Sequence, residues 1–261
     1  MGERAVLYEA ADRIGLITLN RPEQRNAMTP ELLDAYSEAI GEAKADASIR
    51  CLVVTGKGRC FSAGADLRSS MQRSDLGGPS KEASFAMYEP FLQTLDLEVP
   101  VVGALNGHTV GGGFGLSLLA DIRVANLDAK YGANFARLGI HSGLAISYVL
   151  PRIVGAANAS ELLFTGRLVR GSEALQMGLV THAAEADEVL PKAMEIARAI
   201  AASAPLPVRQ MKESIRWGLR WEIREAALRE AGLQAASLGT EDAKEGRTAL
   251  LEKREPEFKG R

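Results

Sequence analysis

At residues 106–116 the chain reads Asn106-Gly107-His108-Thr109-Val110-Gly111-Gly112-Gly113-Phe114-Gly115-Leu116, immediately after the apolar run 101–105. We predict a buried strand at 101–105 and a short helix from Gly113 to Ala120. A helix N-terminus presents unpaired backbone N–H groups and about half a positive charge, and glycine lets an oxygen atom approach those groups closely. Such a junction is typical of an oxyanion hole, which stabilises negative charge on a carbonyl oxygen.

A second loop offers another backbone donor. Residues 60–67 read Cys60-Phe61-Ser62-Ala63-Gly64-Ala65-Asp66-Leu67 and follow the predicted strand 49–55 through the turn 56–58. Alternatively, the glycines serve tight packing of a helix on a sheet, or a nucleotide loop of another fold, although the G-x-G-x-x-G spacing fits poorly. The companion loop favours an oxyanion site, because two loops can hold one carbonyl oxygen between them.

Composition excludes several classes of protein. The 31 basic and 33 acidic residues give a net charge of −2 and form no basic block, so nucleic-acid binding is disfavoured. We find no stretch like a signal peptide and no apolar run near the roughly 20 residues of a membrane helix, so we expect a cytoplasmic protein without membrane contact. The 2 cysteines and 3 histidines have no metal-binding spacing, and no metal site is predicted.

The order of predicted elements indicates an α/β fold. Apolar residues alternate from Ala5 to Asn20 around a turn at Asp12-Arg13, which predicts a hairpin, and Thr29-Pro30 predicts the start of a helix. Strand and helix patterns then repeat up to a strand at 121–125, as in stacked ββα-like units. From residue 142 the pattern is helical, with helices predicted at 156–164, 172–177, 187–202, 207–217, 220–237 and 241–253.

Three local features add to this outline. The polar segment 68–81 is predicted to be a mobile loop or weak helix and a lid beside Ala65. Apolar spacing from Phe85 to Leu95 predicts another helix. Trp217 and Trp221 share a helical face unless Gly218 breaks the helix, and packing or subunit contact is the favoured role for both.

Several separated motifs together resemble the crotonase (enoyl-CoA hydratase/isomerase) superfamily. They are Arg21-Pro22 with Asn26-Ala27-Met28, then Phe61 to Leu67, Asn106-Gly107 with Gly111-Gly112-Gly113, Ala120-Asp121-Ile122-Arg123, and Glu245-Gly246 with Glu252-Lys253-Arg254. The resemblance implies a spiral of ββα units at 1–195 and a C-terminal helical trimerisation region at 196–261. It also implies a homotrimer or a dimer of trimers that acts on acyl-CoA thioesters in fatty acid metabolism, with coenzyme A entering only as part of the substrate and no other cofactor.

The resemblance also assigns roles to individual residues. The backbone N–H groups of Ala65 and Gly112 would hold the thioester oxygen, and the carbonyl of Ala63 would meet the adenine. Residues expected to line the coenzyme A and acyl sites are Arg25, Ala27, Asp66, Leu67, Gly111, Phe135, Leu250 and Lys253. For Asp66, a side chain that caps its own loop is the favoured role. The width of the acyl pocket is expected to depend on Met71, Met87, Phe114, Phe135 and Leu144.

The chain departs from the family at two positions. Family hydratases use two glutamates, and Gly115 and Phe135 stand in their places. Hydration needs an oriented water and a proton delivered to the substrate's α carbon, and neither residue can supply them. His141 is the candidate replacement base, although a partly buried structural histidine is its alternative role. His108 is expected to be a hydrogen-bonded turn residue, and His182 a residue of a surface turn.

Two functions therefore stay open. The first is an enzyme that stabilises a thioester enolate and catalyses isomerisation, decarboxylation or thioester hydrolysis, since these reactions need fewer acidic groups than hydration. The second is a protein that binds acyl-CoA without turning it over. A nucleotide-dependent α/β enzyme is disfavoured, because the chain lacks a phosphate loop with a lysine or a ribose-binding acid.

Overall fold

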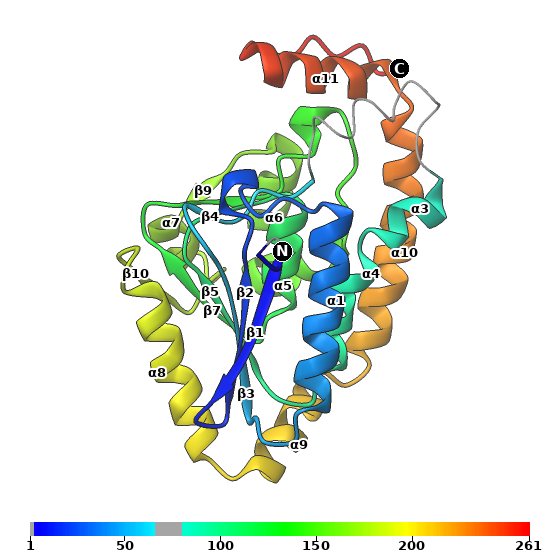
Figure 1. Ribbon diagram of the computed structural model, residues 1–261. Coiled ribbons are helices and arrows are strands. Elements are labelled where there is room, and N and C mark those ends of the chain that lie inside the picture. The colour runs from blue at the N-terminus through cyan, green and yellow to red at the C-terminus, as the bar shows by residue number, and fades with distance from the viewer. Residues whose placement is uncertain (1–2, 66–79) are drawn as a thin grey trace.

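The computed structural model describes residues 3–65 and 80–261, and its strands form two sheets (Figure 1). The larger sheet has the order β1 (Val6–Ala11), β2 (Ile14–Leu19), β3 (Cys51–Gly56), β5 (Val101–Leu105), β7 (Ile122–Asn126) and β10 (His182–Ala184). The smaller sheet has the order β4 (Cys60–Ser62), β6 (His108–Val110), β8 (Lys130–Gly132) and β9 (Val169–Arg170). Pairing is parallel except between β1 and β2 and between β8 and β9.

The two sheets arise from one repeated step. β3, β5 and β7 lie in the larger sheet, and each is followed along the chain by a short strand of the smaller sheet, namely β4, β6 and β8. The predicted repetition of ββα-like units is confirmed. These three-residue strands, with the two-residue β9, are too short to show alternation, so the sequence analysis missed them and predicted that β5 leads directly into the glycines.

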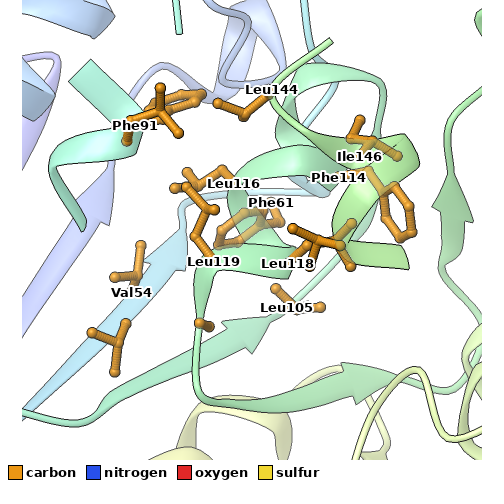
Figure 2. Packing of buried hydrophobic residues seen from close by; sticks show 14 of the residues in the cluster. Val54, Phe61, Phe91, Leu105, Phe114, Leu116, Leu118, Leu119, Leu144 and Ile146 are labelled. Atoms are coloured by element: carbon orange, nitrogen blue, oxygen red, sulfur yellow. The ribbon is translucent and has the colours of Figure 1, made fainter. Parts of the chain in front are cut away.

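Helices cover both faces of the larger sheet. α8 (Val189–Ala202) packs on one face, where Ala193 and Ala197 meet Cys51 and Val53. α1 (Pro30–Ala45) packs on the other face, and the core on that side also includes residues of α5 (Gly112–Leu119), α6 (Ile146–Thr165) and α10 (Leu219–Leu238), which packs against α6 (Figure 1). Leu105, Phe114 and Leu116 lie in this larger core (Figure 2).

Shorter helices complete the described chain. They are η1 (Pro22–Gln24), α3 (Lys81–Ala86), α4 (Glu89–Leu92), η2 (Gln93–Asp96), η3 (Ala136–Leu138), α7 (Gly171–Gln176), α9 (Pro205–Ile215) and α11 (Glu241–Glu252). α11 lies at one end of the molecule against η3, where Gly246 packs on Leu138. No helix in the described ranges is long and apolar enough to cross a membrane.

Local chemistry explains the element boundaries that the sequence predicted. Asp12 and Arg13 both have positive φ, as a tight hairpin turn requires. The side chain of Thr29 accepts a hydrogen bond from the Leu32 N–H, and Pro30 opens α1 with its fixed φ.

Four expectations need correction. The helix predicted around 85–95 is divided into α3, α4 and η2, because Pro90 has no N–H to continue a longer helix. The helix predicted at 156–164 begins earlier, at Ile146, and bends at Gly155, which has φ +79°. Gly218 has φ +73° and separates α9 from α10, so Trp217 and Trp221 do not share one helix. His182 begins strand β10 and is not in a turn.

Candidate active site

The loops that follow β4 and β6 meet at glycines. A Cβ atom at Gly64 would lie 2.7 Å from the Val110 carbonyl oxygen and 2.9 Å from the Gly112 nitrogen. Gly64 has φ +78° and Gly111 has φ +59°, a conformation that favours glycine. The two loops that the sequence predicted to share one oxygen are therefore packed against each other.

Both predicted donors lie at this contact. Gly112 is the first residue of α5, and Ala65 is the exposed residue next to Gly64. Within residues 3–65 and 80–261, no group accepts a hydrogen bond from either N–H. The N-terminal end of α5 adds partial positive charge. The arrangement can bind one carbonyl oxygen, and the assignment of Ala65 and Gly112 as an oxyanion hole stays a prediction.

Asn26 holds the first loop in place. It is fully buried, and its amide nitrogen donates to the carbonyls of Lys57 at 3.1 Å and Cys60 at 2.9 Å. The Ser62 hydroxyl donates to the Asn26 carbonyl at 2.8 Å. Burial raises the pKa of the Cys60 thiol, which keeps this side chain neutral in the loop.

Residues predicted to bind coenzyme A gather beside this loop. The Ala63 N–H donates to the carbonyl of exposed Arg25 at 3.0 Å, and Ala27 is buried two residues farther along the chain. Met28 was not predicted as a site residue. Its N–H donates to the Gly64 carbonyl at 2.9 Å, and a Cβ at Gly112 would lie 2.1 Å from its sulfur atom, so Met28 leaves no room for a side chain at position 112.

Gly115 and Phe135, the two positions at which the sequence analysis expects glutamates to be missing, have apolar surroundings. A Cβ atom at Gly115 would lie 2.7 Å from Cδ2 of Leu144, which is 1 % exposed. The ring of Phe135 lies 3.8 Å from the position of a Cβ atom at Gly111. Leu144 therefore leaves no room for a side chain at position 115 in the present packing.

The family model for enoyl-CoA hydratase/isomerase matches residues 9–261. The chain belongs to this family. It is 36 % identical to the putative enoyl-CoA hydratase/isomerase YngF of Bacillus subtilis over 262 residues, which covers 100 % of both chains. It is 33 % identical to the short-chain-enoyl-CoA hydratase of Clostridium acetobutylicum, with 98 % of each chain covered.

Solved structures agree with this family assignment. The enoyl-CoA hydratase/isomerase from Pseudoalteromonas atlantica superposes with a TM-score of 0.87 at 32 % identity, covering 98 % of this chain and 100 % of the other. The ECH2 decarboxylase domain of CurF from Lyngbya majuscula has a TM-score of 0.84 at 23 % identity, which shows the fold alone, over 95 % of this chain and 100 % of that one. The protein therefore has the crotonase fold that the sequence predicted.

His141, the candidate base of this family member, is half-buried beside α10. The backbone N–H of His141 donates to the Ser237 hydroxyl at 2.9 Å, and its backbone carbonyl accepts from the Gln234 side-chain amide at 3.0 Å. The ring Nδ1 lies 2.7 Å from the Ser142 carbonyl oxygen. A carbonyl can only accept, so Nδ1 carries the proton and Nε2 keeps a lone pair for accepting one.

His108 has a structural role. It begins β6, and its Nδ1 accepts a hydrogen bond from the Lys130 N–H at 3.1 Å. Burial and the nearby charges of Lys130, Arg59 and Arg25 lower its pKa, so the ring is neutral near pH 7. The hydrogen bond agrees with the role expected from the sequence, but the expected turn is wrong, because His108 is the first residue of a strand.

The remaining predicted residues lie elsewhere. Leu250 and Lys253, at the C-terminal end of α11, are exposed. Asp66, Leu67 and Met71 lie outside the described residues, as does nearly all of the predicted lid. The roles predicted for these residues stay predictions.

A buried glutamate beside the site was missed by the sequence analysis. Glu230 on α10 is 1 % exposed, and burial raises its pKa, although hydrogen bonds from Ser147 oppose that rise. The sequence gives no clear signal for it, because a glutamate within a charged helical stretch looks like a residue of the solvated face.

Proposed function

We propose that this protein is an acyl-CoA thioester enzyme that stabilises a thioester enolate with the backbone N–H groups of Ala65 and Gly112. The observation that supports the proposal is the close approach of Gly64 to the Gly112 nitrogen, because Ala65 directly follows Gly64 in the chain. Each donor of an oxyanion hole typically lowers a barrier by about 3 kcal/mol. Membership of the enoyl-CoA hydratase/isomerase family supports a coenzyme A thioester as the substrate.

The coenzyme A part would lie along the loop that contains Arg25, Ala27 and Ala63. Exposed Arg25 offers a positive charge for phosphate, and the Ala63 carbonyl offers an acceptor for the adenine amino group. Leu250 and Lys253 are exposed on α11, and we propose that they reach coenzyme A of a neighbouring subunit in a trimer or a dimer of trimers. Coenzyme A enters as part of the substrate, and no other cofactor is proposed.

We propose that the reaction is not ordinary hydration. Position 115 is a glycine covered by Leu144 and position 135 is a phenylalanine, so neither residue supplies a carboxylate. His141 supplies one proton acceptor, Nε2, which suits isomerisation, decarboxylation or thioester hydrolysis better than a reaction that needs two acidic groups. The same apolar pair favours a second candidate function, an acyl-CoA-binding protein without turnover.

The first experiment adds the protein to a short trans-2-enoyl-CoA and follows the absorbance of the conjugated thioester, with binding of the saturated acyl-CoA measured in parallel. We expect binding, and hydration about 10²- to 10⁴-fold slower than by a family member with both glutamates, which is the usual contribution of acid–base groups. Rapid hydration by the unaltered chain would refute the proposed loss of this reaction.

His141→Ala separates the enzyme from the binding protein. For an enzyme, the rate with a nonhydrating substrate such as a 3-enoyl-CoA falls while acyl-CoA affinity stays within about twofold. Exposed His182 provides the matched control, His182→Ala, with no expected change in either quantity. A chain that binds acyl-CoA but turns over no thioester would support the binding protein.

A further inference from the structure

Three polar side chains of α10 hold the segment 141–147, which forms one wall of the proposed acyl site. Glu230, Gln234 and Ser237 share one face of the helix because they are spaced by four and three residues. The Ser237 hydroxyl accepts from the His141 N–H at 2.9 Å, and the Gln234 amide donates to the His141 carbonyl at 3.0 Å. These bonds anchor the segment at His141, and Glu230 is the candidate anchor for its other end, at Ser147.

Glu230 does bind that end. Its Oε1 accepts hydrogen bonds from the Ser147 N–H at 2.9 Å and from the Ser147 hydroxyl at 2.5 Å. Ser147 lies in the first turn of α6, and the preceding N-cap residue, Ala145, offers no side-chain cap. The carboxylate of α10 thus supplies the negative cap that the N-terminus of α6 lacks.

Between these anchors the backbone is held in an unfavourable conformation. Leu144 has φ +60° and Ala145 has φ +57°, although neither residue is glycine. This turn directs the Leu144 side chain onto Gly115, three residues after the proposed donor Gly112. Side chains that hold Leu144 in this conformation therefore also set the shape of the acyl site.

Tyr88 packs against the same segment at Gly143. Its hydroxyl donates to the Gln234 side-chain oxygen, and a Cβ atom at Gly143 would lie 2.0 Å from that hydroxyl. Glu230 keeps a second oxygen, Oε2, that is buried and has no hydrogen-bond partner among the described residues. A carboxylate buried with half of its hydrogen-bonding capacity unused is costly, so a compensating role is expected.

We propose that Glu230 is a positioning residue for the acyl site, which acts through Ser147 on the Leu144 wall and so sets the affinity for the acyl chain. The proposal rests on the proposed function, because it assumes that an acyl group lies over Gly112 and Gly115. A change at Glu230 is therefore expected to alter the binding of the acyl chain and to leave the binding of the coenzyme A part unchanged.

The test compares Glu230→Ala and Glu230→Gln with the matched control Glu225→Ala, an exposed glutamate of the same helix. Binding of butyryl-CoA, octanoyl-CoA and free coenzyme A is measured by calorimetry. We expect Glu230→Ala to weaken acyl-CoA binding about tenfold and to change the order of the two acyl chains, with free coenzyme A within twofold. Glu230→Gln keeps an acceptor for Ser147 and is expected to remain within threefold of the unaltered protein.

A second readout needs no ligand. Amide hydrogen exchange at Ile146 and Ser147 is expected to accelerate at least tenfold in Glu230→Ala, while exchange in α8 stays unchanged. Unchanged exchange, or equal losses for free coenzyme A and acyl-CoA, would overturn the positioning role. If exchange accelerates but the unaltered protein binds no acyl-CoA, the proposed function fails and with it the acyl-site role, whereas the cap itself stands. If Glu230→Ala does not fold, Ser147→Ala takes its place, because it removes the hydroxyl that Glu230 binds, and unchanged butyryl-CoA and octanoyl-CoA affinities in that variant would overturn the proposal.

Discussion

At the scale of single residues, the position of the Leu144 side chain depends on the absence of a side chain at Gly115. Leu144 fills the space above Gly115, so a glutamate at position 115 would collide with the Leu144 side chain in the present packing. Leu144 and Ala145 both adopt left-handed backbone conformations, which cost roughly 1–2 kcal/mol per non-glycine residue. This cost falls in the segment that we propose as a wall of the acyl site.

The contact between Leu144 and Gly115 predicts which substitutions can introduce carboxylates at the proposed site. Gly115→Glu alone is expected to destabilise the protein by about 1–3 kcal/mol, because the new side chain overpacks against Leu144. The triple variant Gly115→Glu, Phe135→Glu, Leu144→Ala is expected to recover part of that stability and to hydrate trans-2-enoyl-CoA at least tenfold faster than the unaltered chain. Urea denaturation and the enoyl absorbance measure the two effects.

The matched control is Gly115→Ala, Phe135→Ala, Leu144→Ala, which changes the same packing without adding a carboxylate. Equal hydration by the two triple variants would show that the missing carboxylates do not limit this reaction. That outcome would also remove the chemical argument for a different reaction in this chain.

At the scale of elements, a buried ion cluster joins α9 to the larger sheet. Asp121 lies 3.0 Å from the Lys212 ammonium and 2.8 Å from the Arg216 guanidinium, and it accepts a hydrogen bond from the Val101 N–H at 2.7 Å. Burial lowers the pKa of Lys212 to about 8, although Asp121 opposes this change. The cluster fixes the start of β5, the strand that precedes β6 and the glycine loop.

Removal of the central carboxylate should therefore be costly. Asp121→Asn is expected to lower the free energy of unfolding by about 3 kcal/mol, because Lys212 and Arg216 stay buried without their counter-charge. Glu195→Gln, which breaks the exposed pair with Lys192, is the control and is expected to change stability by less than about 0.5 kcal/mol. Equal effects of the two substitutions in urea denaturation would argue against a buried cluster.

Glu230 makes stability depend on pH. Its pKa is higher in the folded protein than in the unfolded chain, where it is near 4.5, because burial disfavours the carboxylate. The folded state thus binds the proton more tightly, and this group's contribution to the free energy of unfolding falls as pH rises from about 4.5 through the folded pKa. Relative to Glu230→Gln, the unaltered protein should lose stability over that interval. A stability difference that is constant between about pH 4.5 and 7.5 in urea denaturation would contradict this assignment.

The sequence predicted long elements better than short ones. The hairpin, α1, β5 and the helices from α7 onward follow from periodicity and capping, because each spans enough residues for a repeat to show or has a clear signal at its start. The strands of the smaller sheet have three residues or fewer, and only tertiary pairing defines them. The residues of the candidate site differ in the same way. The glycine loops can be recognised in the sequence, whereas Met28, Glu230 and Tyr88 come near the proposed site only when the chain folds.

At the scale of the whole molecule, three large apolar side chains near the junction of α9 and α10 are exposed. Ile215, Trp217 and Trp221 are 81 %, 82 % and 68 % exposed in the single chain. Patches of this kind on soluble proteins mark interaction surfaces, and we propose that other copies of the chain cover it. This surface suits the trimer or dimer of trimers predicted from the sequence.

Assembly can be tested through the two tryptophans. The protein is expected to sediment as a trimer or hexamer, and the double variant Trp217→Glu, Trp221→Glu is expected to shift it toward monomer. Phe164→Glu, at an exposed position on α6, is the comparison. A monomeric unaltered protein, or a double variant that sediments unchanged, would contradict the role of this surface.

The central claim is that Ala65 and Gly112 polarise a thioester carbonyl, and the infrared stretch of a bound acyl-CoA labelled with ¹³C at the carbonyl tests it most directly. Two N–H donors that draw charge onto the oxygen weaken the C=O bond, so we predict a shift to lower frequency relative to free acyl-CoA. A ligand that is demonstrably bound, yet keeps the carbonyl frequency it has in water or shifts to higher frequency, would contradict the oxyanion hole and the enolate chemistry built on it.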